Sequence, residues 1–167
     1  MDQVIDFLLR WIHFFGGIIW VGHNYASVVQ RPSFRPLEAK DLGDAGSTVY
    51  MAILGREHGT FRYAAIVTWL AGIGMLWQRG MLMDAITLNG FTAVIGTGLW
   101  IGTFMLANLW LVLWPHQKKV LGFVPAPLEE RVRCARITFL SSRTNTMLSI
   151  PLLFFMAAGS HGAALFA

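Results

Sequence analysis

One face of the first apolar stretch carries side chains that could do chemistry. Arg10, His13, Gly17, Trp20 and Asn24 follow one another at steps of three or four residues, so on a helix they share one face. A polar or small face on an apolar helix is expected to look into a bundle or at a cofactor rather than at lipid. An imidazole without a partner is costly in hydrocarbon and is a common iron ligand. His13 is therefore a candidate metal ligand.

A second histidine lies at a comparable predicted depth on the last apolar stretch. By the rise of a helix, His13 lies roughly 13 Å and His161 roughly 9 Å from the outer ends of their helices. Two imidazoles at matched depth on different helices are what a six-coordinate b-type haem needs. The sequence therefore predicts haem b with His13 and His161 as axial ligands of the iron. The alternative is that each ring bonds to the backbone or to a Ser or Thr neighbour.

Three residues beside His13 fit the same hypothesis, and each has a plainer explanation. Arg10 lies one turn outward and could neutralise a haem propionate or extend to the lipid headgroups. Gly17 would let a flat macrocycle approach the backbone, or would allow close packing of helices. Trp20 could pack against the macrocycle or fill the core.

The other histidines and the cysteine carry weaker signals. His23, near the inner end of the first helix, and His58, just before the second, could form a second ligand pair. His58 lies in a charged segment and is more simply an interfacial residue, and His116 is expected at the surface. The single cysteine, Cys134, excludes a disulfide framework, a Cys-based zinc site and a covalently attached haem c.

These residues have to be positioned by helices that cross a membrane. The 167 residues are 55% hydrophobic and 13% charged, which excludes a disordered chain and an ordinary water-soluble domain. A bilayer core of roughly 30 Å needs about 20 apolar residues in a helix, and four stretches meet this requirement. We expect an all-α fold, a four-transmembrane-helix bundle forming a single membrane domain over residues 1–167. The expected helices are 4–29, 61–78, 90–114 and 146–167, with the connections 30–60 and 115–145 on one side.

The basic residues predict the orientation. Of the thirteen Lys and Arg residues, five lie in or beside the connection 30–60 and six lie within 115–145. Lys and Arg favour cytoplasmic loops. We therefore expect a multi-pass protein of the bacterial inner membrane with both termini in the periplasm. The net charge of +4 then reflects membrane topology, and no nucleic acid partner is expected.

Four strings along the chain resemble one family. In order and position they are similar to the membrane domain of bacterial cytochrome c-linked urate oxidases. Less specifically, the His-rich first helix is similar to small four-helix haem b proteins such as the membrane protoporphyrinogen oxidases. The strings are Arg10-Trp11-Ile12-His13, Phe61-Arg62-Tyr63-Ala64, Trp114-Pro115-His116-Gln117-Lys118-Lys119, and Arg143 to Pro151 with Ser160-His161.

The resemblance implies a membrane oxidoreductase that passes electrons to cytochrome c, with His13 and His161 matching the family pattern. The leading hypothesis is a haem b protein that relays electrons on the periplasmic side. Its expected partners are the lipid bilayer, a separate cytochrome c or a larger membrane redox complex, since the sequence holds no Cys-x-x-Cys-His. One alternative is a haem-free accessory subunit of a larger complex. Association with further copies of the same chain, as a homo-oligomer, is a further alternative. Another is an enzyme that itself oxidises urate or a porphyrin.

Overall fold

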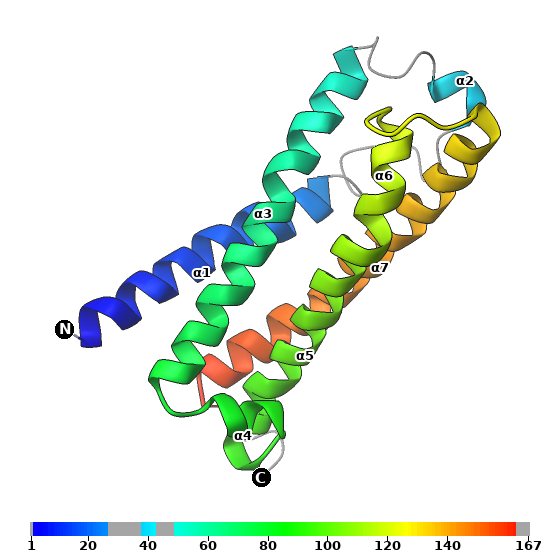
Figure 1. The fold of residues 1–167 in the computed structure, drawn as a ribbon. Coiled ribbons are helices and arrows are strands. Elements are labelled where there is room, and N and C mark those ends of the chain that lie inside the picture. Colours follow the sequence, from blue (N-terminus) through cyan, green and yellow to red (C-terminus); the bar gives the residue numbers. More distant parts are fainter. Residues whose placement is uncertain (1, 27–37, 43–48, 163–167) are drawn as a thin grey trace.

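The computed structural model describes residues 2–26, 38–42 and 49–162, apart from the side chains of residues 2 and 49–58. Every described element is helical, which confirms the all-α prediction (Figure 1). The elements are α1 (Asp2–Tyr25), α2 (Ala39–Leu42), α3 (Val49–Gln78), α4 (Leu82–Ile86), a 3₁₀ turn (Gly90–Thr92), α5 (Ala93–Ala107), a π-helical segment (Asn108–Leu113), α6 (Trp114–Val120) and α7 (Leu128–Ser160).

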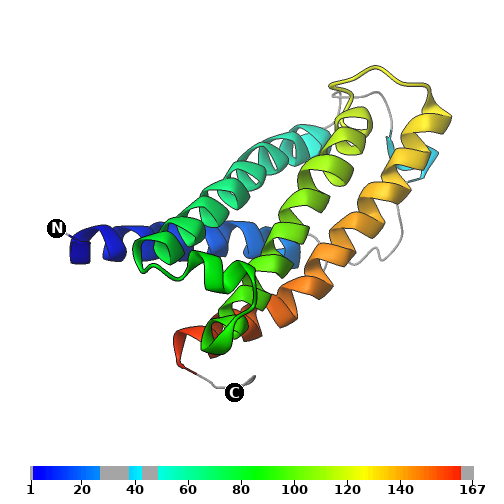
Figure 2. The ribbon, with the colours of Figure 1, turned by 60° about the horizontal axis from the view of Figure 1, so that its bottom comes forward.

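Helices α1 and α3 form an antiparallel pair in which α1 crosses α3 obliquely (Figures 1 and 2). Near the start of α1, the Asp6 carboxylate accepts a hydrogen bond of 2.8 Å from Arg79, just after α3 ends. About three turns further on, the backbone of Gly16 lies so close to α3 that a Cβ there would be 2.5 Å from the Thr68 hydroxyl. Glycine is required at this crossing because it has no side chain.

A second antiparallel pair consists of α5 with its continuation into α6 on one side, and α7 on the other (Figure 2). A Cβ on Gly102 would lie 3.6 Å from Leu152 of α7, which is ordinary van der Waals contact. At the other end of the pair, Lys119 donates a hydrogen bond to Glu130. This hydrogen bond holds the pKa of the Glu130 carboxyl below its usual value.

The two pairs share one core. Trp20 of α1 and Phe61 of α3 are buried, and they pack in one cluster with Met105 of α5, Leu109 of the π-helical segment and Leu152 of α7. Because this cluster draws on all the long helices, it fixes how the α1–α3 pair lies against the α5–α7 pair.

Three helices extend further at one end of the molecule than the sequence predicted. α3 begins at Val49 rather than at residue 61, and α7 begins at Leu128 rather than at residue 146. The apolar runs in the sequence indicate only the part of each helix that suits a bilayer. A helix can continue into water where packing against its neighbours stabilises it. The third helix also runs past Pro115 to Val120. Pro115 lies in the first turn of α6, directly after the π-helical segment, where proline is tolerated.

Three described helical stretches are long and apolar enough to cross a membrane: Gln3–Tyr25, Gly59–Gln78 and Gly90–Val120. The protein is therefore a membrane protein. The predicted fourth span, 146–167, corresponds to the end of α7 and runs into residues 163–167, which lie outside the described residues. The four-span count thus stays a prediction.

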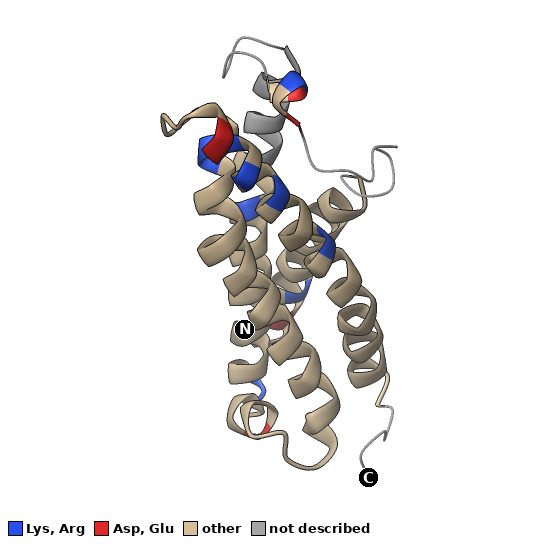
Figure 3. Ribbon diagram, turned by 90° about the vertical axis from the view of Figure 1, so that its right-hand side faces the viewer, with Lys and Arg blue, Asp and Glu red and all other residues tan. Residues whose placement is uncertain are grey.

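Basic side chains gather at one end of the molecule (Figure 3). We call this the basic end and name the opposite end, where α4 joins α3 to α5, the α4 end. Lys and Arg near a membrane span favour the cytoplasmic side, so the basic end is the predicted cytoplasmic end. The residues that define it are Lys118 and Lys119 of α6 and Arg131, Arg133 and Arg136 of α7.

Candidate functional site

His13 is held between α1 and α3 by a hydrogen bond to the backbone. Its Nδ1 lies 2.7 Å from the carbonyl oxygen of Thr68, and the ring is partly buried. A carbonyl can only accept, so this bond assigns the imidazole proton to Nδ1. The neutral ring then carries its lone pair on Nε2. Histidines that bind metals usually have this arrangement, with one nitrogen anchored to a carbonyl and the other facing the metal.

A glycine on α3 makes room for this ring. A Cβ on Gly72 would lie 3.0 Å from Cε1 and 3.1 Å from Nδ1 of His13. The Thr68 hydroxyl turns away and donates to the Ala64 carbonyl at 2.8 Å, which leaves the Thr68 carbonyl to the imidazole. Sequence reasoning missed Thr68 and Gly72. The available signal was their spacing of four residues, which puts a polar and a small residue on one face of an apolar helix.

The Gly72→Ala variant is expected to push the His13 ring away from the Thr68 carbonyl, because the new methyl group would be too close to two ring atoms. Nitrogen-15 NMR of labelled histidine checks this: the Nδ1–H signal that His13→Gln removes should also be lost or shifted in Gly72→Ala. Gly74→Ala is the matched control, since a Cβ there meets only the flexible Leu9 side chain, at 3.3 Å. An unchanged His13 signal in Gly72→Ala would show that the His13 ring does not need the space at Gly72.

His161 lies at the end of α7 and is exposed. Its Nδ1 is 2.8 Å from the carbonyl oxygen of Ala157 and 3.4 Å from the hydroxyl of Ser160. The bond to the carbonyl again assigns the proton to Nδ1 and leaves Nε2 with the lone pair. The helix ends at Ser160, so His161 is not two turns inside a helix as the sequence analysis assumed.

The matched depth of the two rings stays a prediction. Trp69, which follows the residue that anchors His13, donates Nε1 to the Thr103 hydroxyl of α5 at 2.9 Å. Gly102, which precedes Thr103, lies against Leu152 of α7. The depth match drawn from the sequence depended on a helix that continued to residue 167.

The residues predicted around His13 have protein partners. Arg10 donates to the Asp6 carboxylate at 2.7 Å and is exposed near the α4 end. Gly17 lies over Thr68, where a Cβ would be 3.8 Å from the threonine methyl group. Trp20 is only 2% exposed, within the shared core. For Gly17 and Trp20 this is the packing that the plainer alternative predicts.

Of the weaker histidine pair, the structure describes the side chain of one member, His23. The His23 ring stacks on Phe61, with the ring centroids 4.0 Å apart and the planes 11° apart. The side chain of His58 lies outside the described residues. Elsewhere, His116 bonds through Nδ1 to the Val112 carbonyl at 2.6 Å and is half-buried. Among the described residues, no group of three or more His, Cys, Asp or Glu side chains could hold a metal ion alone.

A buried polar network joins the π-helical segment to α7 and was missed by sequence reasoning. The Asn108 amide donates to the Asn145 side-chain oxygen at 2.8 Å and to the Ser141 carbonyl at 3.0 Å. The Ser141 hydroxyl returns a hydrogen bond of 3.0 Å to Asn108, and Asn145 donates to the Met105 carbonyl at 3.1 Å. π-helical turns are often kept at functional sites. The network fixes how α7 and the third span fit together.

The family described as urate oxidase N-terminal matches residues 81–167, slightly more than half of the chain. The chain belongs to the urate oxidase N-terminal family. Searches of curated proteins and of solved structures found no match. The part that matches this urate oxidase family runs from the start of α4 past the end of α7, so it contains the Asn108–Asn145 network and His161. His13 lies outside it, on α1.

Proposed function

We propose that this member of the urate oxidase family is a haem b subunit of a membrane redox enzyme. In this proposal it relays electrons at the α4 end, on the periplasmic side of a bacterial inner membrane, to a separate cytochrome c. The proposal rests on the placement of His13 on an apolar helix. Its imidazole is anchored through Nδ1 to the Thr68 carbonyl, in the space that Gly72 leaves free.

The residues present fit a haem at His13 better than at His161. The His13 ring is partly buried and oriented, with Nε2 left to bind iron, and bound haem would supply one-electron redox chemistry. The chain contributes the ligand, its orientation through Thr68 and an apolar surround. His161 also presents Nε2, as the proposed second ligand.

The test is a visible absorption spectrum of the purified protein, oxidised and then reduced. We expect a reducible b-type spectrum that His13→Ala abolishes, and that His161→Ala converts from the low-spin six-coordinate form to a high-spin form. His116→Ala is the matched control, because this ring has the same Nδ1–carbonyl bond at the other end of the bundle, and its spectrum should be unchanged. A colourless, folded protein, or a normal spectrum in His13→Ala, would end the proposal.

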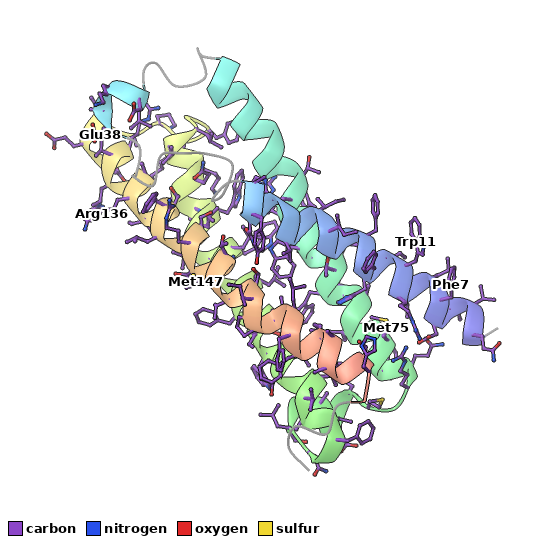
Figure 4. The ribbon with its side chains drawn as sticks, turned by 180° about the vertical axis from the view of Figure 1, so that it is seen from behind. Phe7, Trp11, Glu38, Met75, Arg136 and Met147 are labelled. Carbon is purple, nitrogen blue, oxygen red and sulfur yellow. The ribbon has the colours of Figure 1, made fainter. Side chains whose placement is uncertain are left out.

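A haem-free accessory subunit is a second candidate, and the exposed surface of α1 favours it. α1 packs mainly on α3, and its other side presents large apolar side chains such as Phe7, Trp11 and Phe14, each about three-fifths or more exposed. Phe7 and Trp11 point away from the other helices (Figure 4). A larger membrane complex would cover this surface. This candidate expects co-purification with partners in a fixed ratio, and full activity of that complex when both His13 and His161 are replaced by alanine.

A further inference from the structure

Arg62 of α3 is surrounded by aromatic rings near the basic end of the span. The carbon atom of its guanidinium lies 3.8 Å from the ring centroid of Trp114, 4.7 Å from that of Tyr63 and 5.7 Å from that of Trp110. A guanidinium over an aromatic face is attracted by the π electrons, most strongly over tryptophan. The three rings come from α3, the π-helical segment and α6, so the tertiary fold builds this cluster.

The cluster lies at the depth of a membrane boundary. Arg62 precedes the end of α3 at Gln78 by sixteen residues, about 24 Å along the helix. A hydrocarbon core is roughly 30 Å thick, so Arg62 is close to the boundary opposite the α4 end. Tryptophan and tyrosine rings are enriched at that depth, where one side of the ring is apolar and the other is wet. Lipid headgroups begin at the same level.

The charge of Arg62 has no carboxylate partner among the residues that the structure describes. Among the side chains that the structure describes, Arg62 donates from Nη2 to the Tyr63 hydroxyl at 3.3 Å, and its buried Nε has no acceptor. A second cation adds to the charge, because the Lys118 ammonium lies 6.0 Å from the centroid of the same Trp114 ring. Two cations beside one tryptophan, at the edge of a span, favour the binding of an anion there.

We infer that Arg62 and Lys118, which both lie beside the Trp114 ring, bind the phosphate of an anionic phospholipid headgroup. Guanidinium matches phosphate with two parallel hydrogen bonds, and lysine adds a point charge. Basic side chains between helices at the cytoplasmic surface are a recognised mode of anionic lipid binding. The depth of the cluster favours a lipid over a soluble anion. This inference does not depend on haem binding.

Native mass spectrometry of the full chain in detergent tests the inference. Phosphatidylglycerol should remain bound to the protein, whereas phosphatidylcholine, which has no net charge, should not. Arg62→Gln is expected to reduce the bound phosphatidylglycerol about tenfold, and Arg62→Lys is expected to retain part of it. Arg136→Gln is the matched control, because it removes the same charge from an exposed position at the same end and should leave lipid binding unchanged.

Two outcomes would overturn the inference. Equal retention of phosphatidylglycerol by Arg62→Gln and the unchanged protein would show that Arg62 is not the binding group. Displacement of the lipid by millimolar inorganic phosphate would show that the ligand is a soluble anion. If Arg62→Gln does not fold by circular dichroism, Lys118→Gln gives the same test, with a weaker expected loss of several-fold.

Discussion

The Gly96→Ala variant is expected to be the least stable single variant in α5, because α4 rests directly on this residue. A Cβ on Gly96 would lie 2.1 Å from the carbonyl oxygen of Ala85 and 2.9 Å from its carbonyl carbon. Both are backbone atoms of α4, so a side-chain rotation cannot relieve the clash. Overpacking of this kind costs about 1–3 kcal/mol or more. The movement should also break the hydrogen bond of 3.0 Å from the Trp100 indole to the Ile86 carbonyl.

Thermal unfolding in detergent, followed by circular dichroism, measures this effect. Gly102→Ala is the matched control on the same helix, because its Cβ would meet only a leucine methyl group at ordinary contact distance. We expect the control to unfold close to the unchanged protein and Gly96→Ala to unfold at a clearly lower temperature. Equal midpoints for the two variants would show that α4 does not depend on the close approach at Gly96.

The Asn145→Leu variant is the second case of a large expected loss of stability. Asn145 is 1% exposed, and it accepts a hydrogen bond from Asn108 and donates one to the Met105 carbonyl. Leucine is similar in size but satisfies neither partner. A buried polar group left without its partner costs about 1–3 kcal/mol, and the apolar surroundings offer no water in exchange. The contact between α7 and the π-helical segment should therefore loosen.

The measurement is again thermal unfolding, combined with protease sensitivity of the link between α6 and α7. Thr144→Ala is the control, because this neighbour is exposed and bonds only to the Leu140 carbonyl of its own helix. Asn145→Asp tests the chemistry separately, since it keeps the shape and loses the donor to Met105. If Asn145→Leu is as stable as the Thr144 variant, the network is not a determinant of stability.

The sequence predicted the helical class because long apolar runs leave few alternatives in a membrane. It placed the basic-end boundaries of α3 and α7 too far along the chain, because the parts that leave the bilayer are held by packing. One example is the buried cluster of Leu42, Val120 and Cys134, which covers the start of α7. Hydropathy contains no information on contacts of that kind.

The candidate site was predictable only in part. The spacing on the first helix identified the polar face that carries His13, because that pattern is local. The Thr68 carbonyl and the gap at Gly72 depend on the register between α1 and α3, which a single sequence does not specify. The pairing with His161 stays a prediction. It relied on where the last helix ends, and helix ends are the least predictable feature of a sequence.

The π-helical segment Asn108–Leu113 changes the direction in which the later side chains of the same continuous helix point. Each residue of an α-helix turns the chain by about 100°, so one residue accommodated in a wide turn rotates all later side chains by about that angle. Deleting a single residue there would restore an uninterrupted α-helix and, in the same step, swing Trp114 off the Arg62 guanidinium. In this chain, six residues therefore rotate the face that the second half of one continuous helix presents, relative to the first half.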